Sequence, residues 1–173
     1  MSEDPAGRFV VRAPLAGTVV ALEDVPDAVF AQAMVGPGVA IEPATAEHGP
    51  GEHGPGEPAT GEPSHVIAPA DGRVATAFPH AFALECASGR TVLVHLGIDT
   101  VRLAGEGFAV HVGAGADVRA GDAVVTWSPR DVAAAGLATV CPVVALQADP
   151  GAVEVLVRPG DVVQAGEPLL AWS

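Results

Sequence analysis

The sequence has 173 residues, 49% of them apolar, which suits one globular domain with a hydrophobic core. Its apolar runs are all shorter than the roughly 18 residues needed to cross a bilayer. The first residues, MSEDPAGR, lack the basic and apolar regions of a secretion signal, so we expect a cytoplasmic protein. The formal charge of −13 argues against a nucleic-acid partner and favours a basic protein surface.

The chain begins with residues 1–8, which we expect to form a flexible tail, and residues 9–173 form the single predicted domain. Short β-branched runs separated by Gly and Pro recur through it, which is typical of an all-β sandwich or barrel. The predicted strands are Gly17–Ala21, Gly38–Ile41, His65–Ala68, Ala81–Cys86, Thr91–Leu96, Ala123–Trp127, Val153–Val157 and Pro168–Trp172. One or two short helical turns are predicted, at Asp27–Ala33 and at Pro129–Gly136, where Ser128 and Pro129 suit an N-cap and the first helical position.

Residues 44–64 read ATAEHGPGEHGPGEPATGEPS and consist of Gly, Pro, Glu and small residues. Such a segment buries too little apolar surface to offset the entropy lost on ordering. We therefore predict a disordered insert within the domain, and no function is assigned to it.

Two sequence patterns each occur twice. The pattern VxAPxxGxV spans Val11–Val19 and again Val66–Val74, and VxxGxxVxAGxxxxxW spans residues 112–127 and again 157–172. Their glycines suit tight turns, and the apolar residues that follow suit returning strands. The repetition predicts a duplicated β-motif that packs against its own copy.

The segment PHAFALECASGRTVLVHLGIDT, residues 79–100, indicates a hairpin that carries two histidines. A two-residue turn at Ser88-Gly89 would place Phe82 opposite His95 and His80 opposite Gly97. His80, Phe82, Leu93 and His95 would then share one face of the hairpin. On this register the two imidazoles are diagonal neighbours within reach of each other.

Two neighbouring imidazoles have three interpretations. They can be structural, each ring hydrogen-bonded in or near the core. They can bind zinc, if further ligands are present. One can also be a nucleophile while the other stabilises the transferred group. The residues alone leave these three open.

Several long motifs resemble the glucose-type enzyme IIA domains of the bacterial sugar phosphotransferase system. They occur in the family's order over nearly the whole chain from about Arg12: APLAGTVVALEDVPDAVFAQAMVGPGVAI, VIAPADGRV, HAFALE, VHLGIDTVRLAGEGF, VRAGDAVV and CPVV. The resemblance implies an antiparallel β-sandwich of the duplicated hybrid motif type. It also implies a phosphocarrier that accepts a phosphoryl group from HPr and passes it to the enzyme IIB domain of a sugar permease.

The resemblance also implies the roles of individual residues. His95 would carry the phosphoryl group on Nε2, its Nδ1 bonded to the Gly97 carbonyl, and His80 would stabilise the phosphate. No cofactor is required, and only a transient phosphoryl group is held on His95. A shallow apolar surface bordered by acidic side chains would receive the partners, and we call it the docking surface. Its candidates are Phe30, Met34, Val35, Phe78 and Val101, with Asp27 and Asp99 beside them.

The segment Phe78-Pro79-His80 is shorter than in the family and lacks a threonine that supports the histidine pair, which puts the support of His80 in question. A companion interpretation is a regulatory protein whose docking to targets is switched by phosphorylation of His95. Zinc held by His80 and His95 together with a partner's carboxylate is a further alternative. The membrane would be met only through the permease, and glucose or N-acetylglucosamine is the favoured sugar.

Two rival classes fit the residues less well. Lipoyl and biotinyl carrier domains share the VxxGxxVxAG pattern but need a lysine, and this sequence has none. A LytM-type zinc endopeptidase needs an HxH pair, and residue 97 is glycine.

Overall fold

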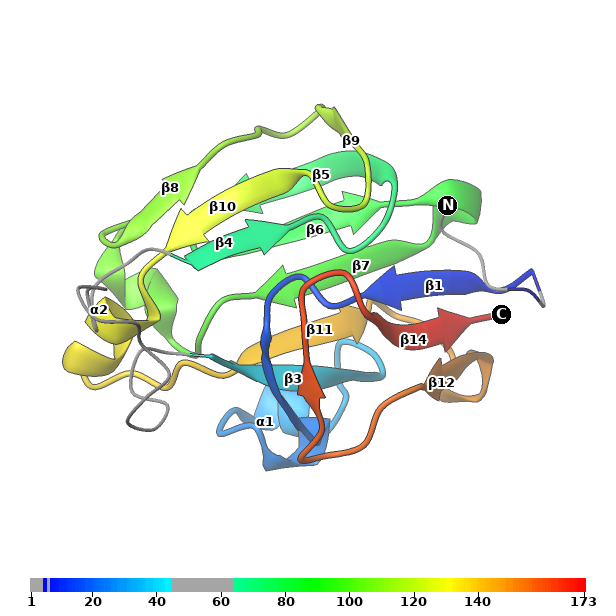
Figure 1. Ribbon diagram of the computed structural model, residues 1–173, viewed down its shortest axis with the longest axis horizontal. Helices are drawn as coiled ribbons and strands as arrows, with labels where there is room; N and C mark the ends of the chain where they lie inside the picture. Colours follow the sequence, from blue (N-terminus) through cyan, green and yellow to red (C-terminus); the bar gives the residue numbers. More distant parts are fainter. Residues whose placement is uncertain (1–4, 6, 45–63) are drawn as a thin grey trace, which may run out of the picture.

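The computed structural model describes residues 5, 7–44 and 64–173, so most of the predicted insert and tail lies outside the described residues. The described residues form fourteen strands and two short α-helices (Figure 1). The elements are β1 (Phe9–Arg12), β2 (Gly17–Val20), α1 (Ala28–Ala31), β3 (Gly38–Pro43), β4 (Ser64–Ile67), β5 (Gly72–Phe78), β6 (Ala81–Glu85), β7 (Thr91–His95), β8 (Phe108–Val110), β9 (Asp117–Val118), β10 (Ala123–Trp127), α2 (Pro129–Ala134), β11 (Cys141–Ala145), β12 (Val153–Val155), β13 (Val162–Val163) and β14 (Pro168–Trp172).

The strands make one large sheet and two small ones, all antiparallel. The large sheet has the order β13-β2-β3-β11-β7-β6-β5-β9, and the small sheets have the orders β1-β14-β12 and β4-β10-β8. The main hydrophobic core includes side chains from all three sheets, such as Val11, Phe82, Trp127 and Leu170. The sheets do not close into a barrel, so the sandwich alternative of the prediction is correct. Among the described residues no helix is long and apolar enough to cross a membrane.

The repeated sequence patterns form a structural duplication, as predicted. Strands β4 to β10 form an inner repeat, residues 64–127, which lies in the chain between the two parts of an outer repeat, residues 9–43 and 141–172. The two halves of the large sheet are symmetric about its centre. Counted inward from one edge the strands are β13, β2, β3 and β11, and from the other edge their counterparts are β9, β5, β6 and β7. At the repeated Ala-Pro motifs, the Arg12 N–H donates to the Pro69 carbonyl and the Ile67 N–H donates to the Pro14 carbonyl, both at 2.8 Å.

All the predicted strands are present to within a few residues at their ends, but other strands escaped prediction. Strand β11 escaped because Pro142 is its second residue, and proline is rare inside a sheet. Its position is tolerated because the ladder between β11 and β7 begins at the next residue, Val143. The N–H that Pro142 lacks is therefore not needed on that side.

Both helical turns are confirmed, and each begins at a side-chain cap. Asp27 accepts hydrogen bonds from the N–H groups of Val29 and Phe30, and the Ser128 hydroxyl accepts one from the Asp131 N–H. Such caps satisfy N–H groups that have no partner within the helix, and each contributes about 1 kcal/mol.

A second, smaller hydrophobic cluster covers the outer side of the large sheet. Helix α1 and the 3₁₀ turn Leu22–Asp24 lie over this side and contribute Phe30, Leu22 and Val25. The sheet contributes Ala40 and Val144, and the loop after β7 contributes Ile98. The loop between β2 and β3 thus covers a part of the sheet that includes β7, which belongs to the other repeat.

Candidate functional site

The hairpin of β6 and β7 has a register one residue away from the prediction. Its turn is a three-residue 3₁₀ turn, Ala87–Gly89, closed by a hydrogen bond from the Cys86 N–H to the Arg90 carbonyl at 2.6 Å. The extra turn residue pairs Phe82 with Val94 and Ala81 with His95. The predicted pairing of Phe82 with His95 is therefore wrong.

The shift separates the side chains that were predicted to share one face. Phe82 points into the main core and is 1% exposed, whereas His95 and Leu93 lie on the opposite face of the sheet. The expected common face of His80, Phe82, Leu93 and His95 does not exist. His80 lies outside strand β6, in the tight turn after β5, so the alternation of the strand does not fix the direction of its side chain.

The two histidines are nevertheless neighbours. The Leu96 N–H donates to the His80 carbonyl at 2.8 Å, which ties the turn to the end of β7. The ring centroids of His80 and His95 are 5.3 Å apart, and their planes are inclined at 70°. Phe78 stacks on the other side of His80, with centroids 5.9 Å apart and planes inclined at 26°. The His80 ring is therefore packed between His95 and the aromatic side chain of Phe78.

The orientation of the His95 ring is set by a short loop. Nδ1 lies 2.6 Å from the Gly97 carbonyl oxygen, which can only accept a hydrogen bond. In the neutral ring, Nδ1 therefore carries the hydrogen and Nε2 carries a free lone pair. Phe30 holds the ring from the side, with centroids 5.3 Å apart and planes inclined at 60°.

Gly97 is needed in this loop for two reasons. Its φ of +75° is a conformation that L side chains rarely adopt. A Cβ atom there would also lie 2.7 Å from Thr100 Cγ2 and 2.8 Å from the Ala138 carbonyl oxygen. Thr100 is fully buried, and its hydroxyl donates to the Leu96 carbonyl at 2.7 Å. The loop that presents the Gly97 carbonyl to His95 is thus held between Thr100 and the Ala138 carbonyl.

Burial lowers the pKa of the His95 imidazole below its usual value of 6.5. The Gly97 carbonyl and the carboxylates of Asp27 and Asp99 act in the opposite direction but do not cancel this effect. Burial and the neighbouring His95 also lower the pKa of His80. Both rings are therefore neutral near pH 7, so the Nε2 lone pair of His95 is available for attack on an electrophile.

Comparison with known proteins agrees with this geometry. Residues 9–151 match the family described as phosphoenolpyruvate-dependent sugar phosphotransferase system, EIIA 1. The chain belongs to this family. It is an EIIA component, which makes it a phosphotransferase component and a phosphocarrier in sugar uptake.

Relatives of this EIIA component include a separate EIIA component and a longer EIIBCA component. A glucose-specific EIIA component from Halalkalibacterium halodurans is 38% identical over 142 residues, which cover 81% of this chain and 72% of the relative. A glucose-specific EIIBCA component from Corynebacterium glutamicum is 40% identical over 147 residues, or 83% of this chain, but the match spans only 19% of that longer relative. The solved structure of the glucose permease IIA from Mycoplasma capricolum has a TM-score of 0.76 at 31% identity and covers 95% of both chains.

The proposed docking surface of this EIIA component is only partly exposed. Met34, Phe78 and Val101 are 68%, 55% and 62% exposed. Phe30 differs from the expectation, because it is 7% exposed and belongs to the second cluster, where it contacts His95 from below the surface. Val35 is half-buried and packs against the same cluster.

Asp27 and Asp99, the two acidic residues proposed for the site, each have a constrained position. Asp27 caps helix α1, and Asp99 has the left-handed backbone conformation, with φ of +61°. Both raise the pKa of His95, so their negative charges lie near its ring. Sequence reasoning missed buried Thr100, whose hydroxyl bonds the Leu96 carbonyl beside the site, because no sequence signal pointed to it.

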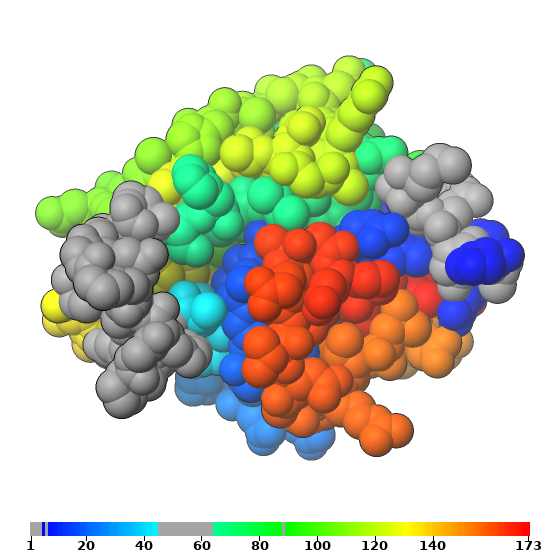
Figure 2. Space-filling model, in the orientation of Figure 1, coloured from blue at the N-terminus to red at the C-terminus, as the bar shows by residue number. Residues whose placement is uncertain are grey.

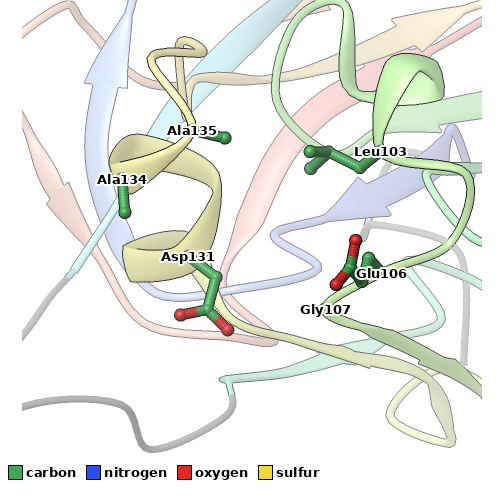
Figure 3. A pocket seen from close by; sticks show the side chains of 6 residues that line it. All are labelled: Leu103, Glu106, Gly107, Asp131, Ala134 and Ala135. Carbon is green, nitrogen blue, oxygen red and sulfur yellow. The ribbon is translucent and has the colours of Figure 1, made fainter.

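A separate hollow of the EIIA component lies between helix α2 and the loop that precedes β8 (Figure 3). It is lined by Leu103, Glu106, Gly107, Asp131, Ala134 and Ala135. Neither His80 nor His95 lines it, and its two carboxylates would repel a phosphoryl group. The residues that the structure describes also contain no cluster of three or more His, Cys, Asp or Glu side chains able to hold a metal.

Proposed function

We propose that Nε2 of His95 accepts a phosphoryl group from the phosphohistidine of HPr and passes it to an enzyme IIB domain. The observation that carries this proposal is the contact between His95 Nδ1 and the Gly97 carbonyl, which leaves the Nε2 lone pair free. In the first step a nitrogen–phosphorus bond to His95 forms, the corresponding bond in HPr breaks, and the HPr imidazole keeps the electron pair. The transfer needs no cofactor beyond the phosphoryl group itself.

His80 has the supporting role in this proposal. Its ring lies beside His95, with centroids 5.3 Å apart, and the stack with Phe78 restricts its movement. When a dianionic phosphoryl group arrives on His95, its charge favours a protonated or hydrogen-bonding His80. His80 would then stabilise the oxygens of the transferred group during onward transfer to the acceptor.

The partners follow from the surface around the histidines. Exposed Met34, Phe78 and Val101 provide an apolar contact area, and Asp27 and Asp99 add negative charge near His95. This combination suits an HPr or IIB surface that is apolar at its centre and basic at its border. The fused relative, a glucose-specific EIIBCA component, supports a IIB and IIC permease as the downstream partner and glucose as the sugar. Transfer to such a permease would take place on the cytoplasmic side.

A regulatory role is the second candidate, and the same exposed apolar side chains support it. Phosphorylation would add about two negative charges to an otherwise apolar contact area. Targets that bind the unmodified surface would then be released. Partner binding that is identical for both forms of the protein would contradict this role.

The test of the main proposal is reconstitution with phosphoenolpyruvate, enzyme I, HPr and a IIB domain. We expect the wild type to gain an acid-labile, base-stable phosphate, measured by intact-mass spectrometry, and His95→Ala to gain none. His80→Ala is expected to accept phosphate but to pass it to IIB slowly. His65→Ala, a change at an exposed histidine of the β4-β10-β8 sheet, is the matched control and should behave as the wild type. Normal phosphate uptake by His95→Ala would refute the proposal.

A further inference from the structure

A second pair of histidines lies on the outer face of the small sheet β4-β10-β8. His65 in β4 lies directly opposite Thr126 in β10, and Ala109 in β8 faces Thr126 from the other side. His111 follows β8, and its N–H donates to the Val124 carbonyl at 2.8 Å, so it extends the same ladder. Both histidines are exposed, and their sheet forms the surface in the green and yellow upper part of Figure 2.

The two rings converge on one hydroxyl group. His111 Nε2 lies 2.5 Å from Thr126 Oγ1, and His65 Nδ1 lies 3.2 Å from the same oxygen. The two ring nitrogens therefore lie within about 6 Å of each other, the sum of these contacts. Because a hydroxyl has one hydrogen to donate, it donates to one nitrogen at most, and the other ring donates to it.

We propose that His65 and His111 form a two-imidazole site for a divalent transition-metal ion, with Cu²⁺ the preferred occupant. Neutral imidazole nitrogens are favoured ligands of Zn²⁺, Ni²⁺ and Cu²⁺, and Cu²⁺ binds nitrogen sites most tightly of these ions. Metal–nitrogen bonds of about 2 Å require the two nitrogens to approach each other by a further 2 to 3 Å. Exposed side chains can make this movement by rotation about their side-chain bonds.

The Thr126 hydroxyl completes the site on the protein side. It lies within hydrogen-bond distance of both nitrogens, so it is placed to contact the ion or to bond a water on it. Because the described residues offer no larger cluster of His, Cys, Asp or Glu, the remaining coordination positions are left to water. The site is therefore an open one, of moderate affinity.

The fold itself does not require these three side chains. The outer repeat has Val10, Ala171 and Leu156 at the positions that correspond to His65, Thr126 and His111. The equivalence of Leu156 and His111 is visible in their ladders, since the Leu156 N–H donates to the Leu169 carbonyl as the His111 N–H donates to the Val124 carbonyl. The ligands occur in the inner repeat, on the opposite side of the sandwich from the second cluster and His95.

The test is titration of the full, untagged chain with Cu²⁺. We expect one equivalent to bind with two nitrogen ligands in the electron paramagnetic resonance spectrum. Both His65→Ala and His111→Ala should weaken binding about 100-fold, because the second ring binds as an intramolecular ligand. Both variants keep their fold because the rings are exposed, and both should still take up phosphate from HPr.

Line broadening of the histidine ring signals by substoichiometric Cu²⁺ assigns the site in the wild type without any substitution. The rings of His65 and His111 should broaden before those of His80, His95, His48 and His53. Broadening that begins at any of these other rings, or equal Cu²⁺ affinity in the wild type and both variants, would overturn the proposal.

Discussion

The two repeats share one backbone plan, but only the inner one carries the reactive pair. The Leu96 N–H donates to the His80 carbonyl at 2.8 Å, and the Ala145 N–H donates to the Pro37 carbonyl at 2.9 Å. These matching bonds make Pro37 the counterpart of His80, and Val144 the counterpart of His95. The outer repeat therefore has a proline and a buried valine where the inner repeat has two imidazoles. The two repeats thus share their backbone arrangement, and a difference at these two positions gives the inner repeat its histidine pair.

The repeats differ also in the loops between corresponding strands. The connection from β5 to β6 is the tight turn that holds His80, whereas the connection from β2 to β3 is long and includes helix α1. Phe30 and Asp27, from the outer repeat, reach His95 of the inner repeat. The site thus combines the histidines of one copy with the covering loop of the other, and neither copy alone would form it.

Removal of Phe30 tests whether the loop of the outer repeat supports the histidine of the inner one. Phe30→Ala leaves a cavity in the second cluster, and we expect it to lower the free energy of unfolding by about 3 to 5 kcal/mol. Urea denaturation measures the loss. Val29→Ala, at an exposed position in the same helix, is the control and should change stability by less than about 0.5 kcal/mol. Equal losses in the two variants would mean that the loop contributes no packing to the site.

The counterpart of Gly97 in the outer repeat is Leu146, which has a side chain. Gly97→Ala tests whether the inner repeat tolerates a side chain at this position. The positive φ and the approach to Thr100 and the Ala138 carbonyl predict a loss of about 2 kcal/mol in the free energy of unfolding. The bond from His95 Nδ1 should lengthen, which ¹⁵N chemical shifts of the ring report. Gly113→Ala is the control, because a Cβ there meets no atom within 4 Å. An unchanged His95 spectrum would show that Gly97 does not orient the ring.

The pH dependence of stability separates the buried histidine from its apolar counterpart. Burial lowers the pKa of His95 in the folded protein, so the unfolded chain binds its proton first as the pH falls through 6.5. The free energy of unfolding should therefore decrease below about pH 6.5, the ordinary pKa of histidine, and this contribution should be complete above it. His95→Val, which copies Val144, should flatten the slope in denaturation at a series of pH values. A slope in His95→Val that is as steep as the wild-type slope, or steeper, would contradict this assignment.

The smallest effect on stability is expected at Phe78, at the end of β5 in the inner repeat. Phe78→Val removes the stack over His80 but fills no core position, so stability should change by about 0.5 kcal/mol or less. The His80 ring should become more mobile in NMR relaxation, and phosphate transfer to IIB should slow while uptake on His95 continues. If onward transfer keeps its wild-type rate, the stack has no positioning role.

The sequence was informative where patterns were long and failed where one residue decided the outcome. The repeated motifs predicted the duplication, and Ser128 and Pro129 supported one of the two helical turns as an N-cap and first helical residue. The hairpin register was missed because Ala87-Ser88-Gly89 gives no local sign that its turn has three residues rather than two. His80 still reached His95 because it lies in a turn, where strand alternation does not apply. Phe30 was placed at the surface by the resemblance, and a helix of four residues is too short for its own pattern to show which face is buried.

Strands β1 and β14 are paired, with Phe9 opposite Trp172, so both ends of the domain leave from the same ladder. Figure 1 shows these ends together, while β7 runs away from them toward the end that holds His95. A linker to a neighbouring module at either end would start on the side of the domain away from His95. It would therefore leave the surface around the histidines accessible. Such a linker would raise the effective concentration of a covalently joined phosphoryl acceptor without obstructing the binding of the phosphoryl donor.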